Sequence, residues 1–263
     1  MGKKLPKIGL ALGGGGAKGL AHIGVLEVLQ ENDIPIHAIA GTSMGALIGG
    51  MYALESDVDV VYEYARQAID GKFLPVFFDM PRGGGFSSGE KAHRLIDTFV
   101  DNKTFQQTCV PFCAVATDLA KGTAVGLKSG LLSSAIRASI SYPPIFDPMR
   151  IGKRVLVDGG LSNQVPVAFA RAMGMDRVIA VNVDADYQFD PEKRMTPATL
   201  SRVTIKLLLR SIAAFSSASA DVIIAPRVGD MSVWLDFNKM DEIILRGRKA
   251  TEKALPAIRA LLK

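Results

Sequence analysis

The sequence contains few of the residues that form metal sites or disulfide frameworks. Its 263 residues include three histidines and two cysteines, Cys109 and Cys113, whose spacing does not match a CxxC motif. This set does not supply a zinc-binding pattern, and sparse cysteine is typical of reducing compartments, so we expect a cytoplasmic protein. Both thiols lie beside apolar residues, and we expect them to be small side chains of the core.

Strong charge of one sign and a membrane-spanning segment are also missing. The net charge is +5, and the basic residues near both ends are not interleaved with aromatic ones, which argues against a nucleic-acid-binding module. The uncharged stretch 37–54 carries Gly45-x-x-x-Gly49 and resembles a membrane helix, but its GlyThrSerMetGly segment would break such a helix. The basic ends are compatible with peripheral contact at the inner face of a membrane.

What the sequence does contain is an alternation of short β-rich and helical segments. This alternation predicts an α/β fold with a mainly parallel sheet and helices on both faces, and the length fits one domain over 1–263. The C-terminal segment 185–263 would complete a domain whose motifs lie in about 8–184. Expected strands are 7–12, 36–40, 112–116, 124–127, 154–157 and 178–183; expected helices are 17–31, a small-residue helix ending at Leu54, and a C-terminal helix with Leu255, Ile258 and Leu262. We expect 184–196 to be a polar surface connection.

The GlyThrSerMetGly segment at 41–45 is a GxSxG motif between a predicted strand and a predicted helix. A serine at such a sharp turn adopts strained dihedral angles, and the flanking glycines remove Cβ atoms that would clash. The turn exposes the hydroxyl of Ser43 at the carboxyl end of the sheet, where ligands of such folds bind. The motif therefore predicts Ser43 as a nucleophile.

A serine nucleophile needs a base, and the usual partner is histidine. In α/β-hydrolases the chain order is serine, acid, histidine, but the last histidine here is His93, so the usual distant C-terminal histidine is absent. His22 lies inside a predicted helix and His37 at the start of a predicted strand, which favours structural roles for both. His93 is the one remaining histidine that we weigh as a base.

A carboxylate is the better candidate. Asp158-Gly159-Gly160 follows the predicted strand 154–157, and the two glycines would let this backbone approach a neighbouring loop closely. Asp158 could then accept the Ser43 proton directly, provided that burial raises its pKa above the ordinary value near 3.9. Asp118 is the competing carboxylate.

The run GlyGlyGlyGlyAlaLysGly at 13–19 follows the first predicted strand and opens a helix. It also matches the dinucleotide-binding spacing GxGxxG, but the second strand ends in Gly41-Thr42-Ser43 instead of the required acidic residue. AlaLysGly likewise differs from the GlyLysSer/Thr of a P-loop. Unhindered amides at a helix start bind a developing anion, so we predict an oxyanion hole beside Ser43.

In this order, GlyGlyGlyGlyAlaLysGly, GlyThrSerMetGly and AspGlyGly resemble the motifs of the patatin-like phospholipase family. Two further blocks, Arg137-Ala138-Ser139 and the segment 158–166, resemble others of that family. The resemblance implies a three-layer α/β/α sandwich and a Ser-Asp dyad that cleaves lipid or lysophospholipid acyl esters without a metal or cofactor. The residues it implies are Ser43 and Asp158 as the dyad, with Gly14, Gly15, Gly16 and Lys18 at the oxyanion hole.

Two alternatives share these motifs: an acyltransferase that forms the same acyl-serine, and a non-catalytic regulatory protein with a vestigial dyad. The phenylalanine-rich segment 71–89 supplies a further hypothesis, a flap lining an acyl channel. Its candidate residues are Phe73, Phe77, Phe78 and Phe86.

Overall fold

A mainly parallel sheet organises the computed structural model, which describes residues 5–69, 79–189, 192, 195–233 and 236–263. The strand order is β5-β6-β3-β2-β1-β7-β8, with β4 paired to β3 off this path. β3, β2, β1, β7 and β8 are parallel to one another in this order, whereas β4 and β6 pair antiparallel with β3, and β5 pairs antiparallel with β6. The strands are β1 (Ile8–Leu12), β2 (Ala38–Thr42), β3 (Phe112–Asp118), β4 (Thr123–Leu127), β5 (Met149–Ile151), β6 (Arg154–Asp158), β7 (Arg177–Val181) and β8 (Val222–Ile224).

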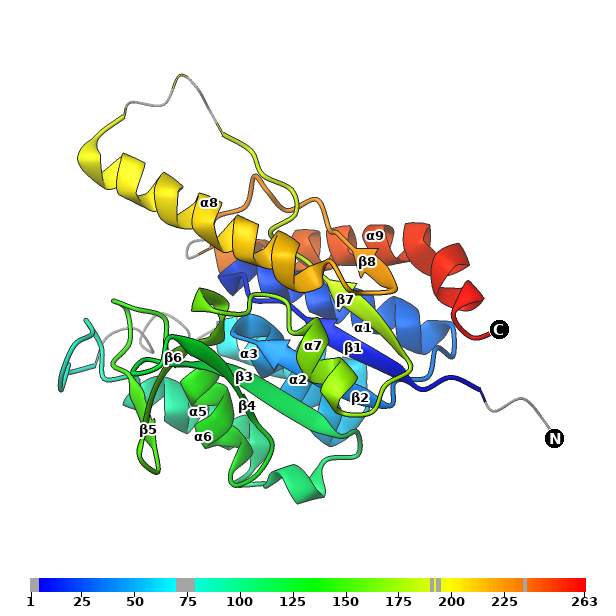
Figure 1. Ribbon diagram of the computed structural model, residues 1–263, viewed down its shortest axis with the longest axis horizontal. Helices are drawn as coiled ribbons and strands as arrows, with labels where there is room; N and C mark the ends of the chain where they lie inside the picture. Colours follow the sequence, from blue (N-terminus) through cyan, green and yellow to red (C-terminus); the bar gives the residue numbers. More distant parts are fainter. Residues whose placement is uncertain (1–4, 70–78, 190–191, 193–194, 234–235) are drawn as a thin grey trace.

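Helices lie on both faces of this sheet (Figure 1). The first face packs against α1 (Ala21–Glu31), α2 (Met44–Glu55), α6 (Leu132–Ser139) and α9 (Met240–Ala260), and the second against α7 (Val167–Ala172) and the end of α8 (Pro197–Ser217). The remaining helices are α3 (Val58–Ile69), α5 (Glu90–Val100) and the short 3-10 segments η1 (Gly16–Leu20), η2 (Phe105–Gln107), η3 (Gly159–Leu161) and η4 (Asp236–Lys239). The predicted α/β/α architecture is confirmed.

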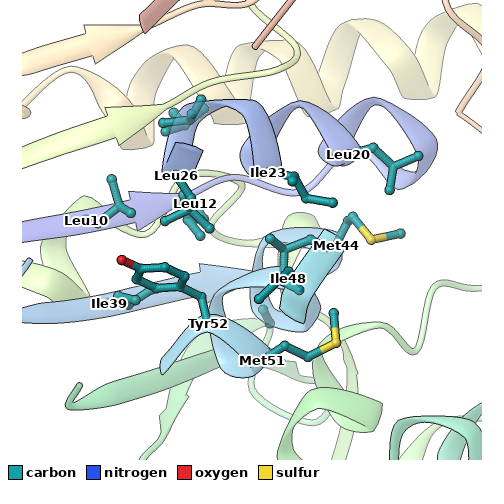
Figure 2. Close-up of a cluster of buried hydrophobic side chains, with 14 of the residues drawn as sticks. Leu10, Leu12, Leu20, Ile23, Leu26, Ile39, Met44, Ile48, Met51 and Tyr52 are labelled. Atoms are coloured by element: carbon teal, nitrogen blue, oxygen red, sulfur yellow. The ribbon is translucent and has the colours of Figure 1, made fainter. Parts of the chain in front are cut away.

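The core forms because alternate strand residues point to opposite faces and both faces are covered. Leu10 and Leu12 of β1 are fully buried against the first helical layer, while Ala11 between them faces the second. Figure 2 shows the first layer, where side chains such as Ile23 of α1 and Ile48 of α2 meet those of the strands. This packing fixes the ends of β1 and β2, where the glycine-rich run and Ser43 lie.

The expected strands are present, but several elements differ from the sequence prediction. The segment 17–31 begins as η1 before it continues as α1, and the 21-residue helix α8 was not predicted. Cys113 is buried as expected, whereas Cys109 is exposed, because it lies in the turn before β3 where its Sγ donates to the carbonyl of Leu54. Among the described residues, no helix is both long and apolar enough to span a membrane.

Candidate active site

Ser43 occupies the sharp turn that joins β2 to α2. Its φ of 53° and ψ of −122° place a non-glycine residue in a region that costs on the order of 1–3 kcal/mol. A Cβ on Gly45 would lie 2.6 Å from the carbonyl oxygen of Gly13, and one on Gly41 would lie 2.6 Å from the Cα of Ala46. The two glycines of the motif therefore allow the strained turn to pack tightly against the end of β1.

The backbone of Ser43 is held by a second helix that the sequence did not connect to it. The amide of Ser43 donates to Ser139 Oγ of α6 at 2.9 Å, and that hydroxyl donates in turn to the carbonyl of Val115 in β3 at 2.6 Å. Ser139 is fully buried, so this bridge is shielded from water. It fixes the strained turn from the side of β3 and gives Ser139 of the Arg137-Ala138-Ser139 block a structural role.

Sheet register places Asp158 level with Ser43. Thr42, the last residue of β2, pairs with Val115, and the next residue of β3, Ala116, pairs with Asp158. Because β6 is antiparallel to β3, the chain reaches Asp158 from the direction opposite to that of β2 and β3. A Cβ on Gly159 would lie 3.1 Å from the side chain of Thr42, which confirms the expected close approach of the AspGlyGly backbone.

The Asp158 carboxylate contacts Ser43 directly. Ser43 Oγ donates to Oδ2 at 2.6 Å, and the amide of Gly160 donates to Oδ1 at 2.7 Å. The side chain of Asp158 is buried, and this burial raises its pKa from 3.8 to about 6, although both hydrogen bonds act in the opposite direction. A hydroxyl therefore faces a single carboxylate whose basicity is increased by desolvation.

The other candidate bases lie elsewhere. His22 Nε2 is 2.7 Å from the carbonyl of Gly13, and His37 Nδ1 accepts from the amide of Ile8 at 3.0 Å. Neither of these, nor His93 on α5, is among the residues described as lining the cavity around Ser43. Asp118 Oδ1 caps a turn by accepting from the amide of Ala120, so of the two candidate carboxylates only Asp158 reaches Ser43.

The glycine-rich run supplies fewer free amides than the sequence predicted. The prediction for Gly14 is wrong, because its N–H donates to the backbone carbonyl of Gln164 at 3.0 Å. Among the described residues, the amides of Gly15 and Gly16 have no hydrogen-bond partner, and both glycines line the cavity that contains Ser43 and Asp158. Gly16 has a φ of +55°, and a Cβ there would collide with the carbonyl of Val233.

Lys18 does not present its ammonium group to the serine. Its side chain is fully buried and its Nζ lies 3.1 Å from Asp184 Oδ1, so the prediction that places Lys18 at the oxyanion hole is wrong. Asp184 Oδ2 accepts from Gln164 Nε2 at 2.7 Å, and the carbonyl of Gln164 accepts from Gly14. These contacts connect η1, the segment after β7 and the segment 158–166. Lys18 therefore holds the glycine-rich loop in place without contacting the serine.

The position of Asp184 corrects a further expectation. The segment 184–196 was predicted to be a polar surface connection, yet Asp184, Tyr187 and Phe189 line the cavity. Asp184 follows the buried residue Val183, three positions beyond the end of β7, and pairs with Lys18. No sequence motif marks it, and its only signal is a carboxylate placed just after a buried strand.

A cavity of about 960 Å³ opens beside the Ser43 hydroxyl. It lies between α2, the segment 140–146, α8 and the segment before α9, and its walls are predominantly apolar. Leu47, Ile145 and Val203 are representative of these walls, and Ser43 and Asp158 are among the polar residues that also line the cavity. A large cavity with mainly apolar walls and polar groups at defined positions is typical of sites that bind a largely apolar molecule.

The phenylalanine-rich segment contributes little to this cavity in the part that is described. Phe73, Phe77 and Phe78 lie outside the described residues. Phe86 is 73% exposed and does not line the cavity, because its backbone pairs with Pro144 and directs the side chain to solvent. The prediction of an acyl-channel role for Phe86 is therefore wrong. Phe146, which was not predicted, lines the cavity instead.

The region that contains the strained serine turn is also the region in which this chain is similar to known proteins. The family model described as patatin-like phospholipase matches residues 10–171, and the chain belongs to this family. The match includes the glycine-rich run, the serine turn and the AspGlyGly block.

The relatives are longer proteins. An uncharacterised NTE family protein of Mycobacterium tuberculosis (strain H37Rv) is 35% identical over 83% of this chain and 60% of its own length. The mouse patatin-like phospholipase domain-containing protein 6 is 29% identical over 90% of this chain, which corresponds to 20% of that protein. The crystal structure of VipD from Legionella pneumophila has the same fold, with a TM-score of 0.62 at 13% identity over 98% of this chain and 67% of VipD.

Proposed function

We propose that the protein is a serine hydrolase that cleaves acyl esters of lipids, with phospholipids or lysophospholipids as the substrate class. The observation that carries this proposal is the 2.6 Å hydrogen bond from Ser43 Oγ to the buried carboxylate of Asp158 at the wall of a large apolar cavity. Membership of the patatin-like phospholipase family supports the lipid ester as substrate.

The first half of the reaction transfers the acyl group to the serine. Asp158 Oδ2 takes the proton of Ser43 Oγ as that oxygen forms a bond to the ester carbonyl carbon. The free amides of Gly15 and Gly16 are the donors that we assign to the resulting oxyanion. The protonated Asp158 then gives its proton to the alcohol oxygen, the carbon–oxygen bond of the ester breaks, and an acyl-serine remains.

The second half releases the fatty acid. Asp158 takes a proton from a water molecule, whose oxygen attacks the acyl carbon and again places negative charge on the carbonyl oxygen. The bond to Ser43 Oγ then breaks, the serine recovers its proton from Asp158, and the free acid leaves. One carboxylate therefore acts as base and acid in both halves, which requires a pKa closer to neutrality than that of an exposed aspartate.

The proposal is tested by hydrolysis of p-nitrophenyl esters by Ser43→Ala and Asp158→Asn proteins. Both should lose at least about a thousandfold in kcat/KM, because each removes one member of a unit that acts together. Asp118→Asn is the matched control, since Asp118 is also a buried carboxylate at a strand end but does not contact Ser43. Activity near the wild-type level in either dyad variant, with the fold intact by circular dichroism, would refute the dyad.

A further inference from the structure

The two sides of the cavity beside Ser43 differ in charge. Among the described residues that line it, the charged ones other than Asp158 all lie within 184–236: Asp184, Arg202, Lys206, Asp230 and Asp236. The part lined by α2, α5 and the segment 140–146, which we call the apolar side, contributes no charged residue to this described lining. An alkyl chain gains most where it is removed from water without desolvating a charged group, so the apolar side is its better path.

A second, smaller cavity of about 50 Å³ adjoins the apolar side and lies between α2, α3 and α5. Met44, Leu47 and Phe237 line both cavities, so these side chains form the boundary between the two. Met44 directly follows Ser43 in the chain, and its side chain is labelled in Figure 2. The second cavity therefore begins next to the turn that holds the serine.

The lining of the second cavity suits a hydrocarbon chain. Met44, Ile48 and Met51 recur at spacings of four and three residues, which places them on one face of α2 (Figure 2). Among the described lining residues, Tyr64 alone has a side-chain oxygen or nitrogen, and its ring stacks on that of Phe99 with the centres 5.0 Å apart. The space exceeds the roughly 10–15 Å³ that one water molecule needs, but such walls offer water few hydrogen bonds. Methionine side chains adapt their shape, so this cavity can adjust to an apolar occupant.

We propose that the second cavity receives the distal end of the substrate's acyl chain and thereby sets the preferred chain length. The chain runs from the acyl carbon at Ser43 along the apolar side and passes the boundary at Met44 and Leu47. The alcohol part of the ester then lies toward α8 and the segment 184–189, where charged groups line the cavity. This inference rests on the proposed function, because it assigns the path of the acyl group that the serine carries.

The test fills the second cavity and compares two p-nitrophenyl esters, the hexadecanoate and the butyrate, in the same detergent solution. Ala68 of α3 is half-buried and lines this cavity. Ala68→Phe should lower the ratio of kcat/KM for the hexadecanoate to kcat/KM for the butyrate by about tenfold. This factor equals about 1.4 kcal/mol, the contribution of roughly two buried methylene groups. Ala65→Leu, which fills the same cavity with a smaller side chain, is the second variant.

Ala254→Phe is the matched control. Ala254 of α9 is also a half-buried helical alanine that packs on the core, but it lines neither cavity. A general loss of structure lowers the rates for both esters together, so the ratio separates such a loss from the filling of a chain site. A ratio that stays at the wild-type value in both filling variants, or that falls equally in the Ala254→Phe protein, would overturn the proposal.

Failure of the proposed function gives a different result. If the folded wild-type protein cleaves neither ester, binding of hexadecanoic acid, measured by isothermal titration calorimetry, tests the second cavity by itself. The Ala68→Phe protein should then bind this acid about tenfold more weakly than the Ala254→Phe protein does. Equal affinities, or no binding by the wild type, would reject the second cavity as a site for the acyl chain.

Discussion

At the scale of the residue, Asp158 combines a gain in basicity with a cost in stability. Burial raises its pKa to about 6, which brings the carboxylate closer to the pH at which a general base works best. The same burial penalises the ionised form of the folded protein. The hydrogen bonds from Ser43 and Gly160 reduce this penalty without removing it.

The first prediction is the pH dependence of catalysis. Because Asp158 must be ionised to accept a proton, kcat/KM for a soluble ester should rise with pH and reach half its maximum near pH 6. The substrate should carry no titrating group in this range. A profile that is half-maximal near pH 4, as expected for an exposed aspartate, would contradict the role of burial.

The second prediction concerns stability. The folded-state pKa of Asp158, about 6, lies above the ordinary value of 3.8, so the folded protein binds the proton more tightly and loses stability as pH rises between these values. A pKa difference of about 2 corresponds to roughly 3 kcal/mol. Asp158→Asn should therefore unfold at higher urea concentration than the wild type at pH 8, and the difference should shrink toward pH 4. A variant that is less stable at pH 8 would argue that ionised Asp158 stabilises the fold.

The contact between Ser43 and Asp158 could be predicted from the sequence, because each stands at a strand end next to glycines, a pattern that reflects tight backbone turns. Their catalytic roles stay predictions. Gly14 was assigned wrongly because a glycine run shows which amides are unhindered but not which ones already donate to a carbonyl. That partner, Gln164, lies far along the chain, and only the fold brings it to the loop.

At the scale of the element, the site depends on how η1 is attached to the sheet. Lys18 on η1 is fully buried and its charge is balanced by Asp184 after β7, which also holds Gln164. Removing one member of a buried ion pair leaves an uncompensated charge, whereas neutral replacement of both members costs much less. The pair therefore links the position of the glycine-rich loop to the integrity of the fold.

The third prediction uses this pair. Asp184→Asn should destabilise the protein by about 3 kcal/mol, because the ammonium of Lys18 then remains buried without its counter-charge. Adding Lys18→Met should restore a large part of that loss. Urea unfolding of the two single variants and the double variant measures the coupling. Additive losses in the double variant would show that the two side chains do not stabilise each other.

Two features at this scale could not be predicted from the sequence: the pairing of β6 and the existence of helix α8. β6 was predicted as a strand, but its antiparallel pairing with β3 follows from contacts distant in sequence and not from its own residues. Helix α8 has apolar residues both toward the cavity, such as Leu209, and toward solvent, such as Leu208. Because its apolar residues do not form a single stripe, the sequence pattern did not predict this helix.

At the scale of the whole molecule, the C-terminal helix α9 packs on α1 and completes the hydrophobic core on that face of the sheet. Gly24 of α1 and Gly247 of α9 allow these helices to cross closely: a Cβ on Gly24 would lie 2.9 Å from the amide of Arg248, and one on Gly247 would lie 3.1 Å from the Cα of Ala21. Arg248 also pairs with Glu27 and Glu31 of α1. We propose that residues 1–263 fold as one patatin-like domain that 185–263 complete.

The fourth prediction follows from this arrangement. A protein truncated after Lys239 lacks α9 and with it Ile243, Ile244 and Ile258, which are 0%, 5% and 0% exposed. Each buried side chain of this size contributes about 1.5–3 kcal/mol, a large share of the typical 5–15 kcal/mol of a folded protein. The truncated protein should lose its cooperative thermal transition by near-ultraviolet circular dichroism. Cooperative unfolding with retained ester hydrolysis would show that the first 239 residues are an independent domain.

The most direct test of the central claim is labelling with a fluorophosphonate probe, which reacts with an activated serine, followed by mass spectrometry of the modified peptide. The wild-type protein should be labelled at Ser43, and Asp158→Asn should abolish labelling while Asp118→Asn leaves it intact. Absence of label on Ser43 in the folded wild-type protein, or equal labelling of the Asp158→Asn protein, would contradict a hydroxyl activated by this carboxylate.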